Sequence, residues 1–541
     1  MTRLAPFLWP CALVALAAAL YLPFLGSPLV FDDRFFFSGR NFARYATTPF
    51  GLELRLPGYF TLAFVEVVAA RIEAHRLVSL ALHACVALAL YKLVADLLRH
   101  AAPASPARLA AFGVAAAFAL HPVAVYGAGY LIQRTGMLAT LFSLLSLVFF
   151  FRGLRERRLA DAATAALMYS IAVLSKETAV LVPAAALAGL YFLRPDRKLT
   201  FRYSAAYLAA CVPAALLAVL LVKGKIGSAY EPDFAVVAAQ VGAVESGSPW
   251  LLSATTQLEL FFRYLGLWLW PHTGGMSIDI RVELGPDGLA LKLAAFLAYA
   301  GACAFLLSRG GRAAMAGFGL LYVWLLYLVE LTTVRFADPF VLYRSYLWAP
   351  GLAVALAASL SLLPARITMV ALLLGLPMLA VQAHDRLQSF SSGLALWQDA
   401  AAKLPAQPVP GGSRTLYQLG REYFYGGDTD KAIATADRCI AEYPSTYDCY
   451  FARAAIHVEL EQYGAALPFI ARAAELRPES GSARHLLGFA LESLGRLEEA
   501  KAQYRAALKL GFHGAVHRLK RLEDPGSGLL PPTRSEAPPP G

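Results

Sequence analysis

The sequence predicts an all-α protein in which a polytopic α-helical membrane domain is followed by a solenoid of paired helices. Of its 541 residues, 58% are hydrophobic and only 16% are charged, whereas soluble proteins are near half apolar and a quarter charged. Apolar runs close to the roughly 20 residues that cross a bilayer recur up to about residue 384. Beyond them, small residues recur at a period of 34. This composition excludes a disordered, collagen-like or disulfide-scaffold chain.

Eleven apolar runs are predicted to cross the membrane. They lie near residues 7–25, 76–98, 107–124, 130–151, 160–175, 178–194, 202–222, 288–308, 314–332, 345–363 and 367–384. The first run contains Pro23 and is followed by Phe31-Asp32-Asp33, which do not resemble the small-residue site of a signal peptidase. We therefore expect an anchoring first helix rather than a cleaved signal.

Basic residues gather in every second loop, which predicts that those loops face the cytoplasm. They are Arg3, Arg99, Arg108, Arg152, Arg155, Arg157, Arg158, Arg194, Arg197, Lys198, Arg202, Arg309, Arg312 and Arg366. This placement accounts for the net charge of +11 without nucleic acid, which we do not expect as a partner. A cytoplasmic N-terminus and an odd number of spans place the C-terminal part outside, together with the long loops 26–75, 223–287 and 333–344.

After a membrane domain at 1–385, a polar connection at 386–412 leads to a repeat domain at 413–524. Three columns of small residues coincide in it at a spacing of 34: Gly420, Ala454 and Gly488; Ala432, Ala466 and Ala500; Cys439, Ala473 and Ala507. Pro444 and Pro478 follow in step. This is the tetratricopeptide pattern, in which small residues let paired helices approach. We expect three repeats, a cap helix at 515–523 and a disordered, proline-rich tail at 525–541.

Two cysteines in the repeat domain are candidates for a disulfide. Cys439 and Cys449 are expected in adjacent helices on the outer side, where an oxidising compartment permits the bond. The sequence does not fix the distance between their Cα atoms, so a disulfide and two free thiols both stay open. The other cysteines lie in or beside apolar runs and are expected to pack there: Cys11, Cys85, Cys211 and Cys303.

The first outer loop begins with two adjacent carboxylates, Asp32 and Asp33. Such a pair beside a bilayer suits a general base, or oxygen ligands for a divalent cation. A solvated loop with incidental acids is the plainer interpretation. The sequence indicates no certain cofactor, and a divalent cation held by Asp32 and Asp33 stays open.

Basic side chains at the outer ends of the spans are candidate ligands for an anion. Arg134, Lys176 and Arg344 each stand at the mouth of an apolar run, where a forked guanidinium or an ammonium group suits a phosphate. Snorkelling at the membrane interface is the alternative for the arginines. Lys176 and Glu177 either form a structural ion pair or contact an anionic head group.

Residues 261–272 are apolar and aromatic, yet both ends of this stretch must lie outside. We therefore expect an interfacial or re-entrant helix, with Trp268 and Trp270 at the level of the head groups. Candidate site residues in or near this stretch or in the outer loops are Arg263, Tyr264, His272 and His121.

The ordered set of these motifs resembles the transmembrane and tetratricopeptide repeat glycosyltransferases, relatives of the protein O-mannosyltransferases in the GT-C superfamily. The likeness covers about residues 30–515 and depends on the order of the motifs more than on any one. The motifs are Asp32-Asp33, His121-Pro122, Arg134-Thr-Gly-Met, Ser175-Lys176-Glu177, Arg263-Tyr264-Leu265 with Trp270-Pro271, Arg344-Ser-Tyr-Leu, and the repeats.

The resemblance implies transfer of a sugar, with mannose favoured, from a polyprenyl-phosphate donor to an acceptor on the outer face. It implies Asp32 as general base, Asp33 as its neighbour, and Lys176, Arg134, Arg263 or Arg344 at the donor phosphate, with His121, Glu177, Tyr264 and His272 nearby. The repeats would hold a protein or peptide acceptor, such as Ser or Thr of exported proteins. The Ala-rich chain and its acid-poor loops suggest a bacterial inner membrane with the repeats in the periplasm.

The chain departs from the family pattern at Arg55-Leu56-Pro57 and at Tyr343-Arg344-Ser345-Tyr346, which leaves the acceptor type open. Two other functions also stay open. One is an inactive, membrane-anchored repeat scaffold for envelope proteins. The other is a lipid or polysaccharide transporter, which the absence of duplicated halves and the scarcity of charge at the middle of the spans disfavour.

Overall fold

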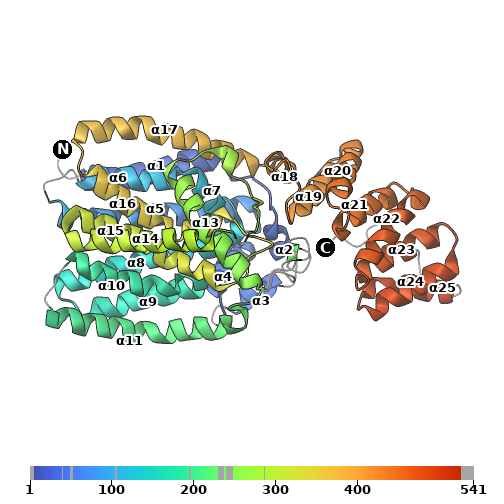
Figure 1. Ribbon diagram of the computed structural model, residues 1–541, viewed down its shortest axis with the longest axis horizontal. Helices are drawn as coiled ribbons and strands as arrows, with labels where there is room; N and C mark the ends of the chain where they lie inside the picture. Colours follow the sequence, from blue (N-terminus) through green and yellow to red (C-terminus); the bar gives the residue numbers. More distant parts are fainter. Residues whose placement is uncertain are drawn as a thin grey trace. The chain divides into compact units, whose positions relative to one another are not determined.

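The structure is a computed structural model that describes residues 5–38, 41–48, 51, 53–103, 107–193, 197–229, 237–238, 248–285 and 287–524. The chain divides into two compact units, Met1–Leu396 and Trp397–Gly541, which we call the membrane unit and the repeat unit. Helices make up both units (Figure 1). In the described ranges, the only β-type pairing is an isolated bridge between Ile280 and Phe340. The predicted all-α fold is confirmed. The predicted tail at 525–541 lies outside the described residues.

The membrane unit is built of long apolar helices joined by short helical turns. In chain order its α-helices are α1 (Ala5–Tyr21), α2 (Asp32–Ser38), α3 (Asn41–Thr47), α4 (Leu56–Val68), α5 (Ile72–Ala101), α6 (Ala107–Ala119), α7 (Pro122–Ala128), α8 (Arg134–Glu156), α9 (Ala160–Ser175), α10 (Val182–Leu193), α11 (Arg197–Val222), α13 (Pro249–Leu269), α14 (Leu289–Arg309), α15 (Gly311–Tyr327), α16 (Ala349–Leu360) and α17 (Ala365–Ser389). The 3₁₀ helices used below are η2 (Leu131–Gln133), η3 (Glu177–Leu181), η6 (Leu328–Thr332) and η7 (Leu342–Tyr346).

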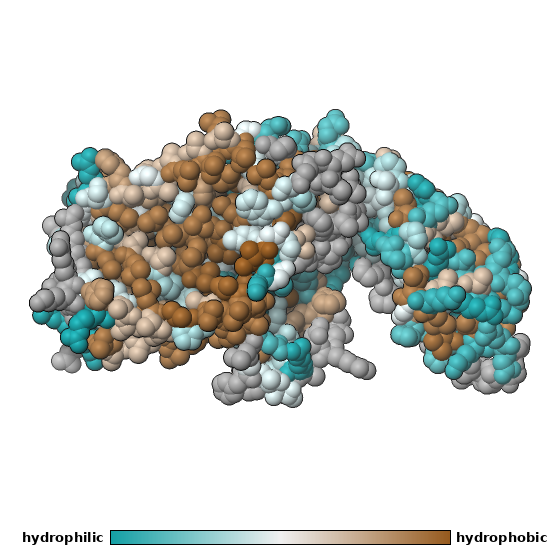
Figure 2. Space-filling model, turned by 60° about the horizontal axis from the view of Figure 1, so that its bottom comes forward, coloured by the Kyte–Doolittle hydropathy of each residue, from teal (hydrophilic) through white to brown (hydrophobic). Residues whose placement is uncertain are grey.

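Seven helices in the described part of the chain are long and apolar enough to cross a membrane, or eight if the bent pair α6–α7 counts as one span. The bend between α6 and α7 measures 64°. The other three predicted spans coincide with the shorter apolar helices α9, η3–α10 and α16. Every one of the eleven predicted runs is therefore an apolar helix, and the chain is a multi-pass membrane protein. Hydrophobic residues cover much of this unit on the face that Figure 2 shows, which agrees with that conclusion.

Among the described helices of the membrane unit that are longer than ten residues, α4 and α13 were not among the predicted spans. Helix α4 is a short apolar helix inside the first long loop. Helix α13 covers most of the aromatic stretch that we expected at the interface, and it exposes Leu269 and Trp270 at its C-terminal end. Pro271 follows Trp270, so the helix ends beside an exposed aromatic residue, which suits a membrane surface.

Small residues set how closely the spans pack. At the crossing of α15 and α16, a Cβ added to Gly319 would overlap the carbonyl oxygen of Gly351, and the reverse holds for Gly351. The two backbones are therefore in direct contact, as is common where helices associate in lipid.

The described helices of the repeat unit form three pairs followed by a shorter helix. Its helices are α18 (Gly393–Ala402, which crosses the boundary between units), α19 (Gly412–Tyr425), α20 (Thr429–Glu442), α21 (Tyr447–Glu459), α22 (Tyr463–Leu476), α23 (Gly481–Ser493), α24 (Leu497–Lys509) and α25 (Val516–Glu523). The small residues of the repeat columns are buried between paired helices: Ala432, Ala466 and Ala500 are each fully buried. The cap helix α25 packs on α24.

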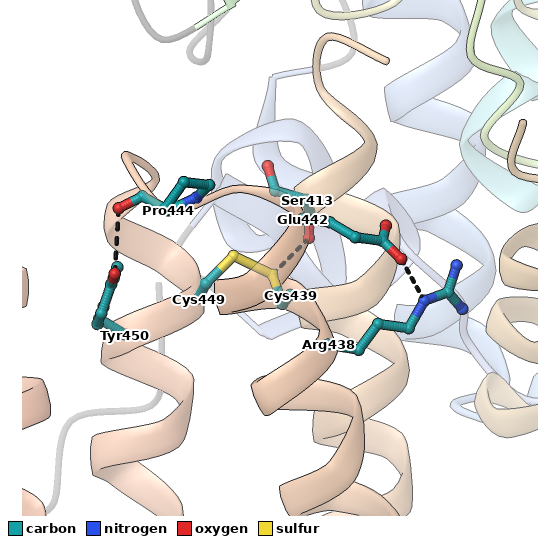
Figure 3. Close-up of a disulfide and its surroundings, with 7 residues drawn as sticks. All are labelled: Ser413, Arg438, Cys439, Glu442, Pro444, Cys449 and Tyr450. Atoms are coloured by element: carbon teal, nitrogen blue, oxygen red, sulfur yellow. Dashed lines mark hydrogen bonds and ion pairs between the residues drawn. A yellow bond between two sulfur atoms is a disulfide. The ribbon is translucent and has the colours of Figure 1, made fainter. Parts of the chain in front are cut away.

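The structure also settles the state of the two cysteines in the repeat unit. Cys439, near the end of α20, forms a disulfide with Cys449 in α21, across the turn that contains Pro444 (Figure 3). The Cα atoms are 5.4 Å apart, within the usual range for this bond. The disulfide therefore joins the first repeat covalently to the second.

Candidate active site

The long loop after α1 turns sharply before its two carboxylates. Phe31 has φ 47°, a left-handed conformation that costs energy for a bulky residue and is held only where the surroundings enforce it. Helix α2 then starts at Asp32, whose backbone N–H donates to the Tyr130 hydroxyl at 3.0 Å. Adjacent helical residues point in different directions, so the Asp32 side chain is exposed while Asp33 is fully buried.

Asp33 is a structural carboxylate. Its two oxygens accept the backbone N–H groups of Leu131 at 3.3 Å and Ile132 at 2.8 Å, so it caps the start of η2. Burial raises the pKa of Asp33 to about 7, against the opposing effects of Arg76 and of these two N–H groups. Asp33 thereby fixes the position of Asp32 relative to η2.

Arg76 fixes the backbone of the same loop just before the two carboxylates. Its guanidinium donates to the carbonyl oxygens of Ser27 at 3.2 Å and Pro28 at 2.7 Å, and to that of Gly129. We call the end of the membrane unit that carries α2, α4, η2, η3 and η7 the loop end. There α2 and α4 pack on η2, and η2, η3 and η7 each pack on α8. The sequence analysis did not single out Arg76, because a basic residue near the start of a span also fits interfacial snorkelling.

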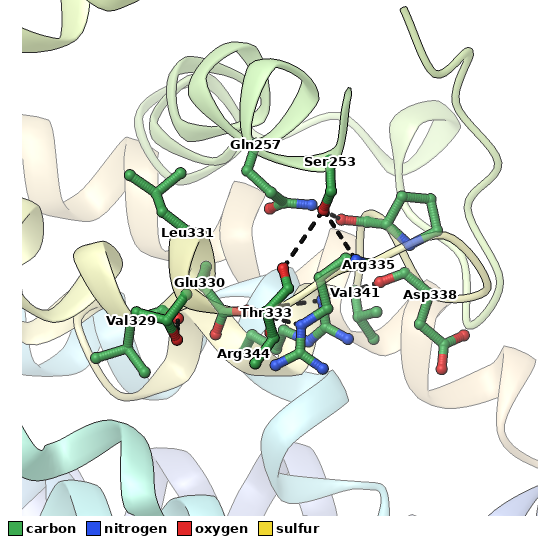
Figure 4. A network of polar contacts seen from close by, with 12 residues as sticks. Ser253, Gln257, Val329, Glu330, Leu331, Thr333, Arg335, Asp338, Val341 and Arg344 are labelled. Carbon is green, nitrogen blue, oxygen red and sulfur yellow. Dashed lines mark hydrogen bonds and ion pairs between the residues drawn. The ribbon is translucent and has the colours of Figure 1, made fainter. Parts of the chain in front are cut away.

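A second group of charges at the loop end surrounds Glu330 (Figure 4). Arg335 and Arg344 each approach its carboxylate to 3.7 Å, and Arg344 also donates to the carbonyl oxygen of Asp338 at 2.9 Å. All three charged side chains are nearly buried, with exposed fractions of 10% or less. Two guanidinium groups therefore share the carboxylate of Glu330.

Lys176 adds a third cation. Its Nζ donates to the Gln133 amide oxygen at 3.4 Å and lies 5.4 Å from the centre of the Tyr343 ring. The long side chain passes over Gly136, where a Cβ would already be 3.5 Å from Nζ. Burial, followed by the Arg55 charge, lowers the pKa of Lys176 to about 8. Its charge is therefore held without a carboxylate in direct contact among the described residues.

Glu177 pairs with a residue other than its neighbour. Of the two alternatives for Lys176 and Glu177, the structural ion pair between them is wrong, because the Glu177 carboxylate binds both ends of the Arg55 guanidinium, at 2.6 and 3.3 Å. Burial alone would raise the pKa of Glu177, but Arg55 outweighs it and lowers the pKa to about 2. The backbone N–H of Arg55 also donates to the carbonyl oxygen of Leu174 at 2.7 Å. This pairing ties the long loop between α1 and α5 to η3.

Arg134 has contacts within the protein. It is fully buried, and its guanidinium donates to the carbonyl oxygens of Thr61 at 3.0 Å and His75 at 2.8 Å and to the Ser79 hydroxyl at 3.3 Å. The structure therefore gives Arg134 the task of joining α4 to α5.

His121 and Tyr264 also have structural contacts. The His121 Nδ1 accepts the Val123 N–H at the start of α7, and its Nε2 donates to the Trp268 carbonyl oxygen at 3.2 Å. The Tyr264 hydroxyl accepts the Val341 N–H at 2.9 Å and donates to the Val341 carbonyl oxygen at 2.8 Å. These two side chains attach α7 and the 333–344 loop to α13.

Arg263 and His272 are exposed on or beside α13. The Arg263 guanidinium lies 4.7 Å from the centre of the Phe340 ring. Within the described residues, neither side chain contacts Asp32 or Lys176. Within the described ranges, no group of three or more His, Cys, Asp or Glu side chains is placed to hold a metal ion.

Two tyrosines lie between the carboxylate and the cations. The Tyr130 ring is 5.9 Å from that of Tyr343, and Tyr130 contacts Asp32 while Tyr343 contacts Lys176. Burial raises the pKa of Tyr343, and the carboxylates of Asp338 and Asp32 act in the same direction. Asp32, Tyr343 and Lys176 thus belong to one continuous site.

An apolar cavity of about 240 Å³ opens beside the cations. Its charged lining residues are Glu177, Lys225 and Arg335, and the rest is formed mainly by aliphatic side chains of η3, α11 and η6. Its aliphatic lining includes Val180, Leu181, Val219, Val222, Leu328 and Val329. The sequence analysis missed this cavity, because its walls come from three distant segments that read as ordinary membrane spans.

Comparisons with known proteins agree with this architecture. Residues 56–222 match the family model of dolichyl-phosphate-mannose-protein mannosyltransferases, and residues 414–446 and 481–510 match models of tetratricopeptide repeats. None of the curated proteins is similar enough to the chain to count as a match.

Three solved structures are similar over parts of the chain. The apo oligosaccharyltransferase of Archaeoglobus fulgidus is 14% identical, with a TM-score of 0.42, over 77% of this chain and 60% of that chain. The same enzyme in complex with an inhibitory peptide and a dolichol-phosphate is 13% identical, with a TM-score of 0.39, over 80% and 60%. MamA of Desulfovibrio magneticus is 21% identical, with a TM-score of 0.21, over 29% and 82%.

Proposed function

We propose that this chain is a membrane glycosyltransferase that moves a sugar, with mannose favoured, from a polyprenyl-phosphate donor to a hydroxyl group of an acceptor. The match of residues 56–222 to the mannosyltransferase family supports the reaction class. The observation that carries the proposal is the gathering, at one end of the membrane unit, of an exposed carboxylate, three cations and an apolar cavity.

The donor contacts the apolar cavity, the cations and the carboxylate in that order. Its isoprenoid chain occupies the apolar cavity, whose lining is mainly aliphatic and packs against hydrocarbon. Its phosphate meets Lys176 and Arg344, whose charges exceed that of Glu330. Positive groups fixed where negative charge accumulates on the leaving phosphate lower the barrier to its departure. Arg134 and Arg263 are not assigned to the phosphate, since their contacts lie elsewhere.

Asp32 acts as the general base. As the acceptor oxygen forms a bond to C1 of the sugar, its proton passes to the Asp32 carboxylate. The bond from C1 to the phosphate oxygen breaks, and its electrons leave with the polyprenyl phosphate. Attack from the side opposite the leaving phosphate inverts the anomeric centre. Asp33 and Arg76 are positioning residues, since they hold the backbone on either side of Asp32.

The acceptor is a protein, and its Ser or Thr hydroxyl receives the sugar. Tetratricopeptide repeats bind extended segments along their paired helices, and a tethered binding module raises the local concentration of its ligand. The disulfide between Cys439 and Cys449 supports an oxidising compartment for the repeat unit. We therefore propose a bacterial inner membrane, a cytoplasmic N-terminus and periplasmic repeats.

The test is transfer of labelled sugar by purified full-length protein, supplied with polyprenyl-phosphate-mannose and exported proteins of the host. We expect Asp32→Asn to lower the rate at least about 100-fold, which is the usual contribution of a general base. The matched control is Asp430→Asn, which changes an exposed carboxylate in the first turn of α20 and should leave the rate unchanged.

Either of two results would refute the proposal. One is an Asp32→Asn variant that transfers sugar at the wild-type rate. The other is a wild-type protein that transfers no sugar from mannose, glucose, galactose or aminosugar donors, and this result would favour the scaffold function instead.

A further inference from the structure

Tyr343 occupies a distinct position at the loop end. It lies in η7, with Lys176 Nζ 5.4 Å from the centre of its ring and the Tyr130 ring 5.9 Å away. Its side chain is only partly buried, whereas Tyr130 is fully buried. Tyr343 is therefore the member of this tyrosine pair that a ligand can reach.

The Tyr343 hydroxyl has no hydrogen-bond partner in the part of the chain that the structure describes. Nearby tyrosines behave differently, because each bonds to a protein group through its hydroxyl: Tyr264 to Val341, Tyr327 to Gln257, and Tyr346 to His83. A half-buried tyrosine offers an apolar ring and a polar end to the same ligand. Its unused hydroxyl points to a ligand with hydroxyl groups of its own.

The geometry of the donor places its sugar beside this residue. This step rests on the proposed function: the phosphate meets Lys176 and Arg344, and the base is Asp32. The sugar carbon C1 is bonded to the phosphate and is attacked from the side of the base, so the sugar ring must lie between the two. Tyr343 touches Lys176 on one side and Tyr130, the partner of Asp32, on the other.

We propose that Tyr343 contacts the sugar of the donor and takes part in selecting which sugar is bound. Lys176 covers one face of the ring, which leaves the hydroxyl end to exchange a hydrogen bond with a sugar hydroxyl. Sugars that differ in the orientation of one hydroxyl are then distinguished, because a site built to bond one hydroxyl rejects an analogue that leaves its polar group unpaired.

The experiment separates the sugar from the lipid phosphate. Full-length protein in lipid nanodiscs is loaded with fluorescent polyprenyl phosphate, which is displaced by unlabelled polyprenyl phosphate or by the same lipid carrying mannose, glucose or galactose. The ratio of each sugar lipid's Kd to that of bare polyprenyl phosphate reports the contribution of the sugar alone. The variant is Tyr343→Phe, and the matched control is Tyr191→Phe, whose side chain is 71% exposed on α10.

In wild-type protein we expect one sugar lipid to bind more tightly than the bare lipid. Tyr343→Phe should reduce that advantage about tenfold, the usual effect of one hydrogen bond, and leave the Kd of bare polyprenyl phosphate and the control variant unchanged. A misfolded variant would lose affinity for the bare lipid and for the sugar-bearing lipid together.

Three results would overturn the inference. Tyr343→Phe with an unchanged ratio shows that the hydroxyl does not touch the sugar. Equal weakening of bare and sugar-bearing lipids shows that Tyr343 acts on the phosphate end or on folding. Wild-type protein that binds bare polyprenyl phosphate but gains nothing from any sugar also refutes it. Failure of wild-type protein to bind bare polyprenyl phosphate would refute the proposed function itself, and this inference with it.

Discussion

The disulfide between Cys439 and Cys449 gives the most quantitative prediction. The perturbation is the double replacement Cys439→Ala/Cys449→Ala, or reduction of the wild-type bond. The cysteines are separated by 10 residues, and closure of a loop of that length in the unfolded chain corresponds to about 2.7 kcal/mol of stability. For a repeat unit of this size, that free energy corresponds to a fall in Tm of roughly 9 °C. Both cysteines are buried, so alanine adds no unpaired polar group.

The assay is thermal unfolding of the isolated repeat unit, residues 397–541, followed by far-UV circular dichroism. This unit contains no cysteine other than Cys439 and Cys449, so a reductant acts on this bond alone. Oxidised wild type should melt well above reduced wild type, and the double variant should be insensitive to reductant. If oxidised and reduced wild type melt within about 2 °C of each other, the bond does not constrain the unfolded chain as the loop-closure argument requires.

Three further predictions concern the membrane unit. Because the pKa of Lys176 is lowered to about 8, its ammonium is lost as pH rises through that value. The donor KM should therefore rise above pH about 8 in wild type but not in Lys176→Arg, and identical pH profiles would contradict this role. The pKa of Asp33 is raised from 3.8 to about 7 in the folded protein. Its contribution to stability is therefore fully present below pH 3.8 and is lost as pH rises through 7, by at most about 1.4 kcal/mol per pH unit. A profile of Tm against pH that is equally steep in Asp33→Asn would refute the raised pKa of Asp33. Finally, Gly351→Ala should destabilise the α15–α16 contact by about 1–3 kcal/mol, whereas Gly375→Ala, with open space around its Cβ position, should not; equal thermal stability of the two variants in detergent would show that the helices separate without cost.

The sequence predicted the fold well because its two signals are local. Hydrophobic runs and a repeat of 34 residues follow from solvation and from helix pairing, which do not depend on distant partners. The predicted helices were therefore found, including the short pair α9 and α10. Helix α4 was missed, because it is shorter than a membrane span and lies inside a segment that was interpreted as a loop.

The candidate site was harder to predict, because it depends on pairings across the fold. Arg134 and Lys176 look alike in the sequence, as cations at the mouths of spans. In the structure, however, the Arg134 guanidinium bonds to carbonyl oxygens of α4 and α5, whereas Lys176 contacts Tyr343. Glu177 was considered as a partner of its neighbour Lys176, but its partner Arg55 lies 122 positions away. Such choices are set by the tertiary arrangement, and spacing along the chain carries no information about them.

The bend between α6 and α7 has a consequence for how the protein is assembled in the membrane. The break lies within a pair of apolar helices, and residues 119–131 around it are all buried in protein, as irregular backbone at membrane depth requires. Two of the residues that bury this bend come from much later in the chain. The Trp268 carbonyl oxygen accepts a hydrogen bond from His121, and the Tyr346 ring packs against Gly127. During synthesis the early spans must therefore wait, with this segment unprotected from lipid, until residues near 346 emerge. Nascent chains cut short before that point should be preferred substrates for membrane quality-control proteases.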